Sequence, residues 1–227
     1  MPGLRSGTAR ALLDTRMLDS KLASRLLFGT AAFAALSFAA VTAAVLSGKT
    51  RRFDERAKRR VHGARVDFGH ARALRNAALG TTPLGKWWAY LPPSLATARR
   101  LQQQGKSAAA VAVAGAAVAA ALMPPLLSRL MPRRLSPPER PKLSTHSYPS
   151  GHALKTSAVA VTTSYVLLRE GLVPGWSVAP FGLASLAAGA GRLLLDRHWT
   201  SDVIGGYFAG IALGATCAGV YELAANQ

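Results

Sequence analysis

Four long stretches of this chain contain no Asp, Glu, Lys or Arg, and they constrain its fold more than any other feature. They cover residues 26–48, 107–128, 171–191 and 203–221, so each is 19 to 23 residues long. A helix needs roughly 20 apolar residues to cross a bilayer core about 30 Å thick. The sequence therefore predicts an all-α protein whose helices cross a membrane several times.

Two weaker apolar stretches bring the expected number of transmembrane helices to about six. One covers residues 87–98 and contains Pro92-Pro93, and the other covers residues 153–168 and is interrupted by Lys155. The sequence has no alternating strand pattern and no convincing internal repeat. The predicted fold is a polytopic membrane helical bundle.

The remaining segments indicate how the chain is organised. Residues 1–25 are basic and polar and precede the first transmembrane helix at 26–48, while residues 87–227 form the predicted membrane-embedded core. A cleaved signal peptide is an alternative for the N-terminal region. Its apolar stretch is longer than the usual signal core of about 7–15 residues, so we expect a retained first helix.

Basic residues dominate the charge, with 28 Lys and Arg against 10 Asp and Glu and a net charge of +18. Much of this charge lies beside the apolar stretches, where anionic membrane lipids are the nearest partner. Nucleic-acid binding is not expected, because aromatic residues do not alternate with the basic ones. Residues 49–86 carry eleven basic residues. They favour an amphipathic helix on the membrane surface, with a solvated loop as an equal alternative.

Three short polar segments contain the residues that suggest chemistry. They cover residues 133–141, 149–152 and 192–202. The chain is expected to cross the membrane twice between the second and the third segment, and the first two segments belong to one loop. All three are therefore expected on the same side, where ionisable residues at helix ends often line a functional cavity.

The third segment offers a nucleophile together with a group that orients it. His198 and Asp202 are four residues apart and share a face if this segment is helical. Asp202 would then fix the imidazole tautomer and leave the other ring nitrogen free to attack. His152 in the second segment is suited to protonate a leaving oxygen.

Candidate anion-binding groups accompany these residues. Ser150 and Gly151 open a predicted helix, whose free N–H groups attract anions, and Arg133, Arg140 and Arg192 supply guanidinium groups that suit phosphate oxygens. Each residue alone has a structural explanation, such as a helix cap or an interfacial anchor. Their joint spacing and sidedness favour a phosphoryl-transfer site.

The sequence predicts chemistry without a metal or another cofactor. Only Glu139, Asp196 and Asp202 are acidic near the site, whereas a two-metal phosphatase usually needs a carboxylate cluster. The neighbouring arginines and histidines would also repel a cation.

The three segments resemble the signature of the type 2 phosphatidic acid phosphatase superfamily, whose members are integral membrane lipid phosphatases. Its usual form is Lys-x6-Arg-Pro, then Pro-Ser-Gly-His, then Ser-Arg-x5-His-x3-Asp. Residues 149–152 match the whole second part, and Arg192, His198 and Asp202 match the third part in type and spacing. The resemblance covers about residues 128–210, and the six-helix layout extends it to most of the chain.

The first part of the signature matches less closely. In one register Arg133 stands where the family has Lys and Arg140 matches the family's Arg, which keeps the charge but changes its geometry. Another register starts at Ser128 and loses this part of the signature. Gly191 also replaces the Ser that opens the third part.

The resemblance implies a phosphohistidine mechanism that needs no metal. His198 would attack phosphorus, Asp202 would orient it, and His152 would protonate the departing oxygen. The residues implied to hold the phosphoryl oxygens are Arg133, Arg140, Ser150, Gly151 and Arg192. Water would then hydrolyse the intermediate.

The implied function is hydrolysis of a lipid phosphate or diphosphate, of the polyprenyl diphosphate, prenyl-linked sugar phosphate or phosphatidate type. The alternatives are transfer of the phosphoryl group or phospho-headgroup to a lipid acceptor, and a non-catalytic membrane scaffold. The family places its site on the extracytoplasmic face, here of the cell membrane. The positive-inside rule favours the opposite orientation, because the site side carries most of the basic residues.

Overall fold

The computed structural model describes residues 4–67, 71–131, 134–137 and 146–225 of the chain. Within these ranges every regular element is a helix, which confirms the predicted all-α fold. The α-helices are α1 Leu4–Leu46, α2 Arg51–Asp67, α3 Ala71–Gly80, α4 Trp87–Gln103, α5 Ser107–Leu130, α6 Gly151–Arg169, α7 Val178–Leu194 and α8 Thr200–Ala224. Two short 3-10 helices, η1 Thr82–Gly85 and η2 Gly175–Ser177, precede α4 and α7.

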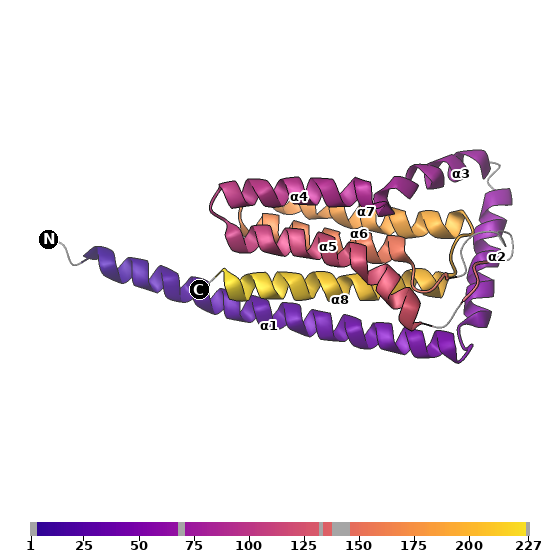
Figure 1. Ribbon diagram of the computed structural model, residues 1–227, viewed down its shortest axis with the longest axis horizontal. Helices are drawn as coiled ribbons and strands as arrows, with labels where there is room; N and C mark the ends of the chain where they lie inside the picture. The colour runs from indigo at the N-terminus through magenta and orange to yellow at the C-terminus, as the bar shows by residue number, and fades with distance from the viewer. Residues whose placement is uncertain (1–3, 68–70, 132–133, 138–145, 226–227) are drawn as a thin grey trace.

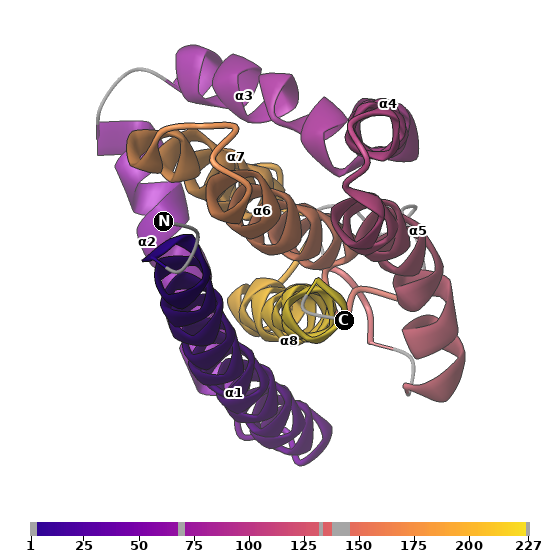
Figure 2. The same cartoon turned by 90° about the vertical axis from the view of Figure 1, so that its left-hand side faces the viewer.

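Six of the helices run side by side, and the other two lie at one end of this bundle. Figures 1 and 2 show α1 and α4 to α8 in the bundle, with α2 across its end and α3 leading from α2 towards α4. Helix α8 packs most extensively against α1 and α6. The beginnings of α6 and α8 and the end of α7 all lie at the end where α2 lies (Figure 1).

Four helices are long and apolar enough to cross a membrane. They are Asp19–Leu46, Ser107–Leu130, Gly175–Leu194 and Thr200–Ala224, and each overlaps one of the stretches without charged residues. Helix α4 has only 17 residues and contains two prolines, and α6 has 19 residues and contains Lys155. The chain is therefore a multi-pass membrane protein, and the total of six transmembrane helices stays a prediction for α4 and α6.

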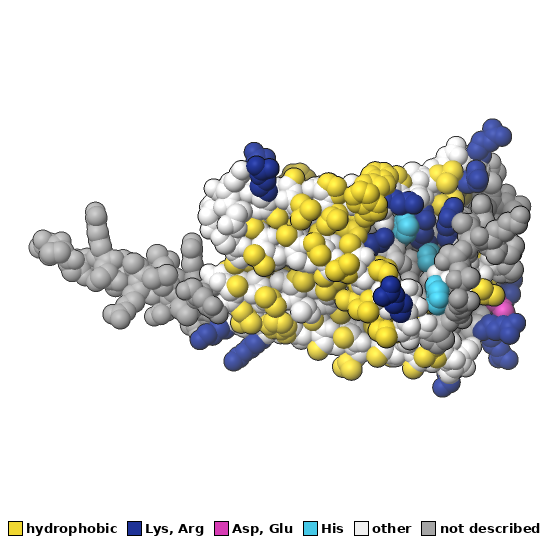
Figure 3. Space-filling model, viewed as in Figure 1, with side chains coloured by type: hydrophobic (Ala, Val, Ile, Leu, Met, Phe, Trp, Pro, Cys, Tyr) yellow, Lys and Arg dark blue, Asp and Glu magenta, His cyan; other side chains and the backbone are white. Residues whose placement is uncertain are grey.

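The surface of the bundle also suits a bilayer. Figure 3 shows apolar side chains over the flank of the bundle and basic side chains gathered near its ends. Large apolar side chains such as Phe33 and Leu36 are exposed there, as expected where lipid chains replace water. Trp87 and Trp88 are exposed at the end near α2, and Trp176 is exposed at the opposite end. Tryptophans at both ends fit the two interfaces of a membrane.

Glycines on α8 allow its backbone to touch that of α6. Gly206, Gly210 and Gly214 recur every four residues and so lie on one face of the helix. A Cβ atom at Gly206 would lie 2.5 Å from the carbonyl oxygen of Ser150, and one at Gly214 would lie 2.7 Å from that of Ala158. This close approach, typical of small residues in membrane helices, brings the first residues of α6 beside the first turn of α8.

Two predicted segment boundaries differ from the helix ends. Helix α1 continues through residue 25, because Lys and Arg have good helix propensity and do not interrupt it. The basic segment 49–86 forms the two helices α2 and α3, followed by η1, rather than one helix. Its contact with anionic lipid stays a prediction.

Candidate active site

The polar segments meet at the end of the bundle where α2 lies. The N–H of Ser150 donates to the carbonyl oxygen of Asp202 over 2.9 Å, and His198 contacts the carbonyl oxygen of Ser147. Arg134, from the first segment, contacts Asp202 as well. The prediction that these segments lie on one side is confirmed for the residues that the structure describes.

His198 precedes α8 and is held in one tautomer. Its Nδ1 lies 2.8 Å from the carbonyl oxygen of Ser147. Because a carbonyl oxygen only accepts, Nδ1 must carry the proton, which leaves a lone pair on Nε2. The carboxylate of Asp202 lies 3.6 Å from Nδ1, beyond hydrogen-bond distance. The direct partner of His198 is therefore a main-chain carbonyl, with Asp202 close enough to act through its charge.

Asp202 is fully buried and held from two sides. It accepts a hydrogen bond from the N–H of Trp199 over 2.8 Å, as a carboxylate in the first turn of a helix often does. Arg134 donates to its other oxygen over 2.6 Å. These two contacts fix the carboxylate beside the His198 ring.

Arg134 is itself held by Asp54, a residue of α2 that sequence reasoning missed. Asp54 is 1% exposed and accepts from Arg134 over 2.6 Å. It also accepts from the N–H of Ser201 over 2.8 Å and from the hydroxyl of Ser201 over 2.7 Å. Arg134 lies in the first polar segment, next to Arg133, so the sequence indicated that this part of the chain belongs to the site. The sequence did not indicate Asp54, because an acidic residue within a basic segment has no feature that identifies its partner 80 residues away.

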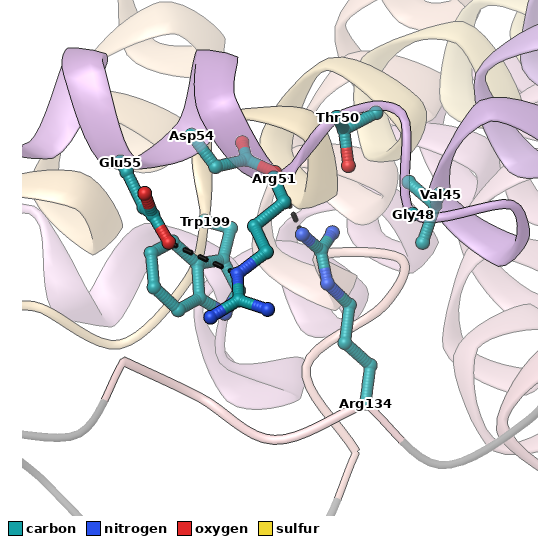
Figure 4. Close-up of a pocket in the computed structure, with 8 residues that line it drawn as sticks. All are labelled: Val45, Gly48, Thr50, Arg51, Asp54, Glu55, Arg134 and Trp199. Carbon is teal, nitrogen blue, oxygen red and sulfur yellow. Dashed lines mark hydrogen bonds and ion pairs between the residues drawn. The ribbon is translucent and has the colours of Figure 1, made fainter.

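A cavity of about 390 Å³ adjoins this network. Figure 4 shows the side chains of Arg134 and Asp54 pointing towards one another, with the Arg51–Glu55 ion pair of 3.1 Å nearby. Trp199 forms another part of the wall. Among the described residues, none of the predicted catalytic or phosphate-binding side chains lines this cavity, so it adjoins the site without forming it.

His152 lies on the first turn of α6 against η1. Its Nε2 is 3.2 Å from the carbonyl oxygen of Thr82, so Nε2 carries a proton and Nδ1 is the nitrogen that can accept one. The imidazole occupies the space in front of Gly85, where a Cβ atom would overlap the ring. A glycine at this position thus allows η1 to approach and position His152.

Two of the predicted phosphate-binding side chains are buried, and each has a polar atom without a hydrogen-bond partner among the described residues. The hydroxyl of Ser150 has no hydrogen-bond partner among the described residues, although Ser150 is completely buried. Arg192 on α7 is 3% exposed; it donates to the hydroxyl of Thr82, and its Nε has no partner in the described part of the chain. Buried donors without acceptors are costly, so both side chains suit an anion.

The chain just before α6 is fixed by Tyr148. Its ring stacks on Phe38 of α1 at 6.1 Å between centroids, and its hydroxyl lies 2.8 Å from that of Thr42. Burial raises the pKa of Tyr148 to about 12, so the hydroxyl stays protonated. Gly151 begins α6, where its N–H is one of the free donors of the first turn.

Arg133 and Arg140 lie outside the described residues, so the register of the first motif is not placed by the structure. Among the residues that are described, no group of three or more His, Cys, Asp or Glu side chains is arranged to hold a metal ion. The predicted site residues that the structure describes are His198, His152, Asp202, Ser150, Gly151 and Arg192.

Comparison with known proteins identifies the family of this chain. The sequence model of the PAP2 superfamily matches residues 105–224. The lipid A 1-phosphatase of Porphyromonas gingivalis is 39% identical over 71 residues, which are 31% of this chain and 15% of that protein. The chain thus matches only a small part of the length of this curated relative.

A solved structure has the same fold. The first transmembrane PAP2 type phosphatidylglycerolphosphate phosphatase from Bacillus subtilis aligns with a TM-score of 0.67, over 82% of this chain and 92% of that one. The two sequences are 21% identical, so this likeness concerns the fold alone.

Proposed function

Because the chain belongs to the PAP2 superfamily, whose model matches more than half of its residues, we propose that it is a membrane phosphatase that hydrolyses a lipid phosphate ester. The observation that carries the proposal is the state of His198. Its Nδ1 proton is engaged by a carbonyl, which leaves Nε2 as a nucleophile. Unpartnered donors of Ser150 and Arg192 lie in the same site.

In the first step, Nε2 of His198 attacks phosphorus and the bond from phosphorus to the lipid oxygen breaks. Burial lowers the pKa of His152 to about 3, so His152 takes up a proton beside the negative charge of the bound phosphate, and its Nδ1 passes this proton to the oxygen as it leaves. Phosphoryl transfer depends on positioning and on stabilising charge on the transferred oxygens. The hydroxyl of Ser150, the N–H of Gly151 and the guanidinium of Arg192 supply that stabilisation, and Arg133 and Arg140 join them in this proposal.

In the second step, water attacks the phosphohistidine and releases inorganic phosphate. His152, now neutral, accepts the proton of this water, as microscopic reversibility requires. The positive charge on His198 is stabilised by the carboxylate of Asp202, 3.6 Å from Nδ1. No step needs a metal, because arginine and backbone donors neutralise the phosphoryl oxygens.

The lipid chain has a place beside this site. A groove of about 350 Å³ between α4, α6 and α7 is lined mainly by apolar side chains, including Leu84, Phe181 and Leu167. Leu84 belongs to η1, which also positions His152. We propose that this groove holds the chain of the substrate while its phosphate lies between the two histidines.

Phosphate release by detergent-purified protein tests the proposal. We expect release from at least one of a prenyl diphosphate, a prenyl monophosphate and a phosphatidate, unchanged by EDTA and abolished in His198→Ala. The control is His62→Ala, which changes a histidine outside the proposed set. Loss of release with EDTA would contradict metal independence. Folded protein without release, or with phosphate found only on an added alcohol, would contradict hydrolysis.

A further inference from the structure

Two lysines and a tyrosine lie on α4 and α6 near η1, the segment that holds His152. Lys155 is one turn after His152 on α6, so the two share a face of that helix. The Nζ of Lys155 lies 6.0 Å from the ring centroid of Tyr90 on α4, and Lys86 is the N-cap of the same helix. Figure 3 shows basic side chains gathered around histidines at this end of the bundle.

Among the described residues, no acidic side chain balances the charge of either lysine. In the described part of the chain, neither Lys86 nor Lys155 forms an ion pair. The acidic side chains found in ion pairs there have other partners, namely Arg51, His62, Lys106, Arg134, Arg169 and His198. Lys86 acts electrostatically on Lys155, and Lys155 acts on His152. Lys155 is half-buried and Lys86 is exposed. Two like charges that act on one another, without a counterion among the described residues, favour an added anion.

Tyr90 provides a second and independent indication of a ligand. It is 7% exposed, and its hydroxyl has no hydrogen-bond partner among the described residues. A buried tyrosine hydroxyl usually has a partner, because an unsatisfied donor costs free energy. Tyr90 also lines the groove proposed for the lipid chain. The cluster therefore lies where the groove approaches His152.

We propose that Lys86, Lys155 and Tyr90 form a second anion subsite, which binds a phosphate on the leaving-group side of His152. This inference rests on the proposed phosphatase function and specifies its substrate class as a lipid diphosphate. His198 attacks the terminal phosphorus, and the bond to the bridging oxygen breaks. That oxygen takes the proton of His152 and departs with the lipid monophosphate. Groups beside His152 therefore bind the leaving group, and positive charge there suits a leaving phosphate.

The test compares kcat/KM for farnesyl diphosphate and farnesyl monophosphate. Loss of one charged contact costs about tenfold, so Lys155→Met should lower kcat/KM for the diphosphate about tenfold and leave the monophosphate within about twofold. Lys155→Arg should restore most of the diphosphate activity, and Tyr90→Phe should lower it by about threefold. Lys49→Met, which changes an exposed lysine near the same end, should change neither.

Inhibition by inorganic anions supplies a measurement that does not depend on the lipid chain. Pyrophosphate should inhibit the wild-type protein more strongly than orthophosphate does, and Lys155→Met should remove this difference. Equal losses on both farnesyl substrates, or no loss on either, would overturn the subsite. Wild-type protein that hydrolyses only the monophosphate would also overturn it and leave the phosphatase intact. Wild-type protein that hydrolyses no lipid phosphate would instead overturn the proposed function.

Discussion

A main-chain carbonyl, rather than a carboxylate, accepts the Nδ1 proton of His198. The sequence predicted Asp202 as the neighbour, since a spacing of four residues places two side chains on one helix face. It did not predict Ser147, because a carbonyl oxygen has no residue-type signature and lies 51 residues away. Motif spacing thus located the site residues, while the contacts that orient them depend on tertiary packing.

A substitution of Asp54 tests whether the contacts that orient Asp202 matter for catalysis. Asp54→Asn removes the charge that holds Arg134, and with it the geometry of Asp202. We expect kcat to fall about tenfold with KM nearly unchanged, because the contact acts on positioning rather than on binding. Steady-state kinetics on a lipid phosphate measure both constants.

The matched control for Asp54 is Glu55→Gln. Glu55 is the next residue, but it is more exposed and pairs with Arg51 on the surface, so both constants should stay unchanged. Asp54→Glu should recover part of kcat. An effect of Asp54→Asn on thermal stability alone, with kcat retained, would show that Asp54 has only a structural role.

Among the helices, the charge-free stretches predicted which segments are helical better than where each helix ends. The stretch at 26–48 belongs to a helix that begins at Leu4, and the stretch at 203–221 belongs to a helix that covers Thr200–Ala224. The absence of charge marks the apolar core of a bilayer, whereas a helix continues into the interface. The glycine spacing on α8 was visible in the sequence, but its partner helix was not.

Gly214→Ala tests the contact between α6 and α8 at a point remote from the histidines. A Cβ atom there would lie 2.7 Å from a carbonyl oxygen of α6, so the helices must separate. We expect a loss of about 1–3 kcal/mol in the free energy of unfolding, seen as a lower Tm in detergent. Gly182→Ala on α7, where nothing lies within 4 Å of the added Cβ, should keep or slightly raise the Tm.

In the whole molecule, the two ends of the bundle have different polar networks. At the end away from the site, Glu222 accepts from Tyr165 over 2.6 Å and from Arg169 over 2.8 Å, and Lys106 pairs with Glu170. At the site end, basic residues prevail, and this excess opposes an extracytoplasmic site by the positive-inside rule. Some of these basic residues contact Asp202 or are proposed to bind phosphate, so their place follows from the proposed chemistry rather than from the side of the membrane. We therefore expect the family's orientation.

Labelling of single cysteines tests this orientation. In a Cys217→Ser background, Lys49→Cys marks the site end and Gln104→Cys marks the opposite end, and both positions are exposed. We expect a membrane-impermeant maleimide to label residue 49 in intact cells and residue 104 only after permeabilisation. The reverse pattern would place the site on the cytoplasmic face and agree with the count of basic residues.

The contact between α6 and α8 also determines which parts of the site are preassembled. Ser150 and Asp202 lie where these two helices touch, and the N–H of Ser150 donates to the carbonyl oxygen of Asp202. His198 is held just before α8 by the carbonyl oxygen of Ser147. Arg192 comes from α7, and the carbonyl that holds His152 comes from η1. The nucleophile therefore belongs to the α6–α8 pair, whereas the contacts that hold Arg192 and His152 come from α7 and η1, which border the proposed groove.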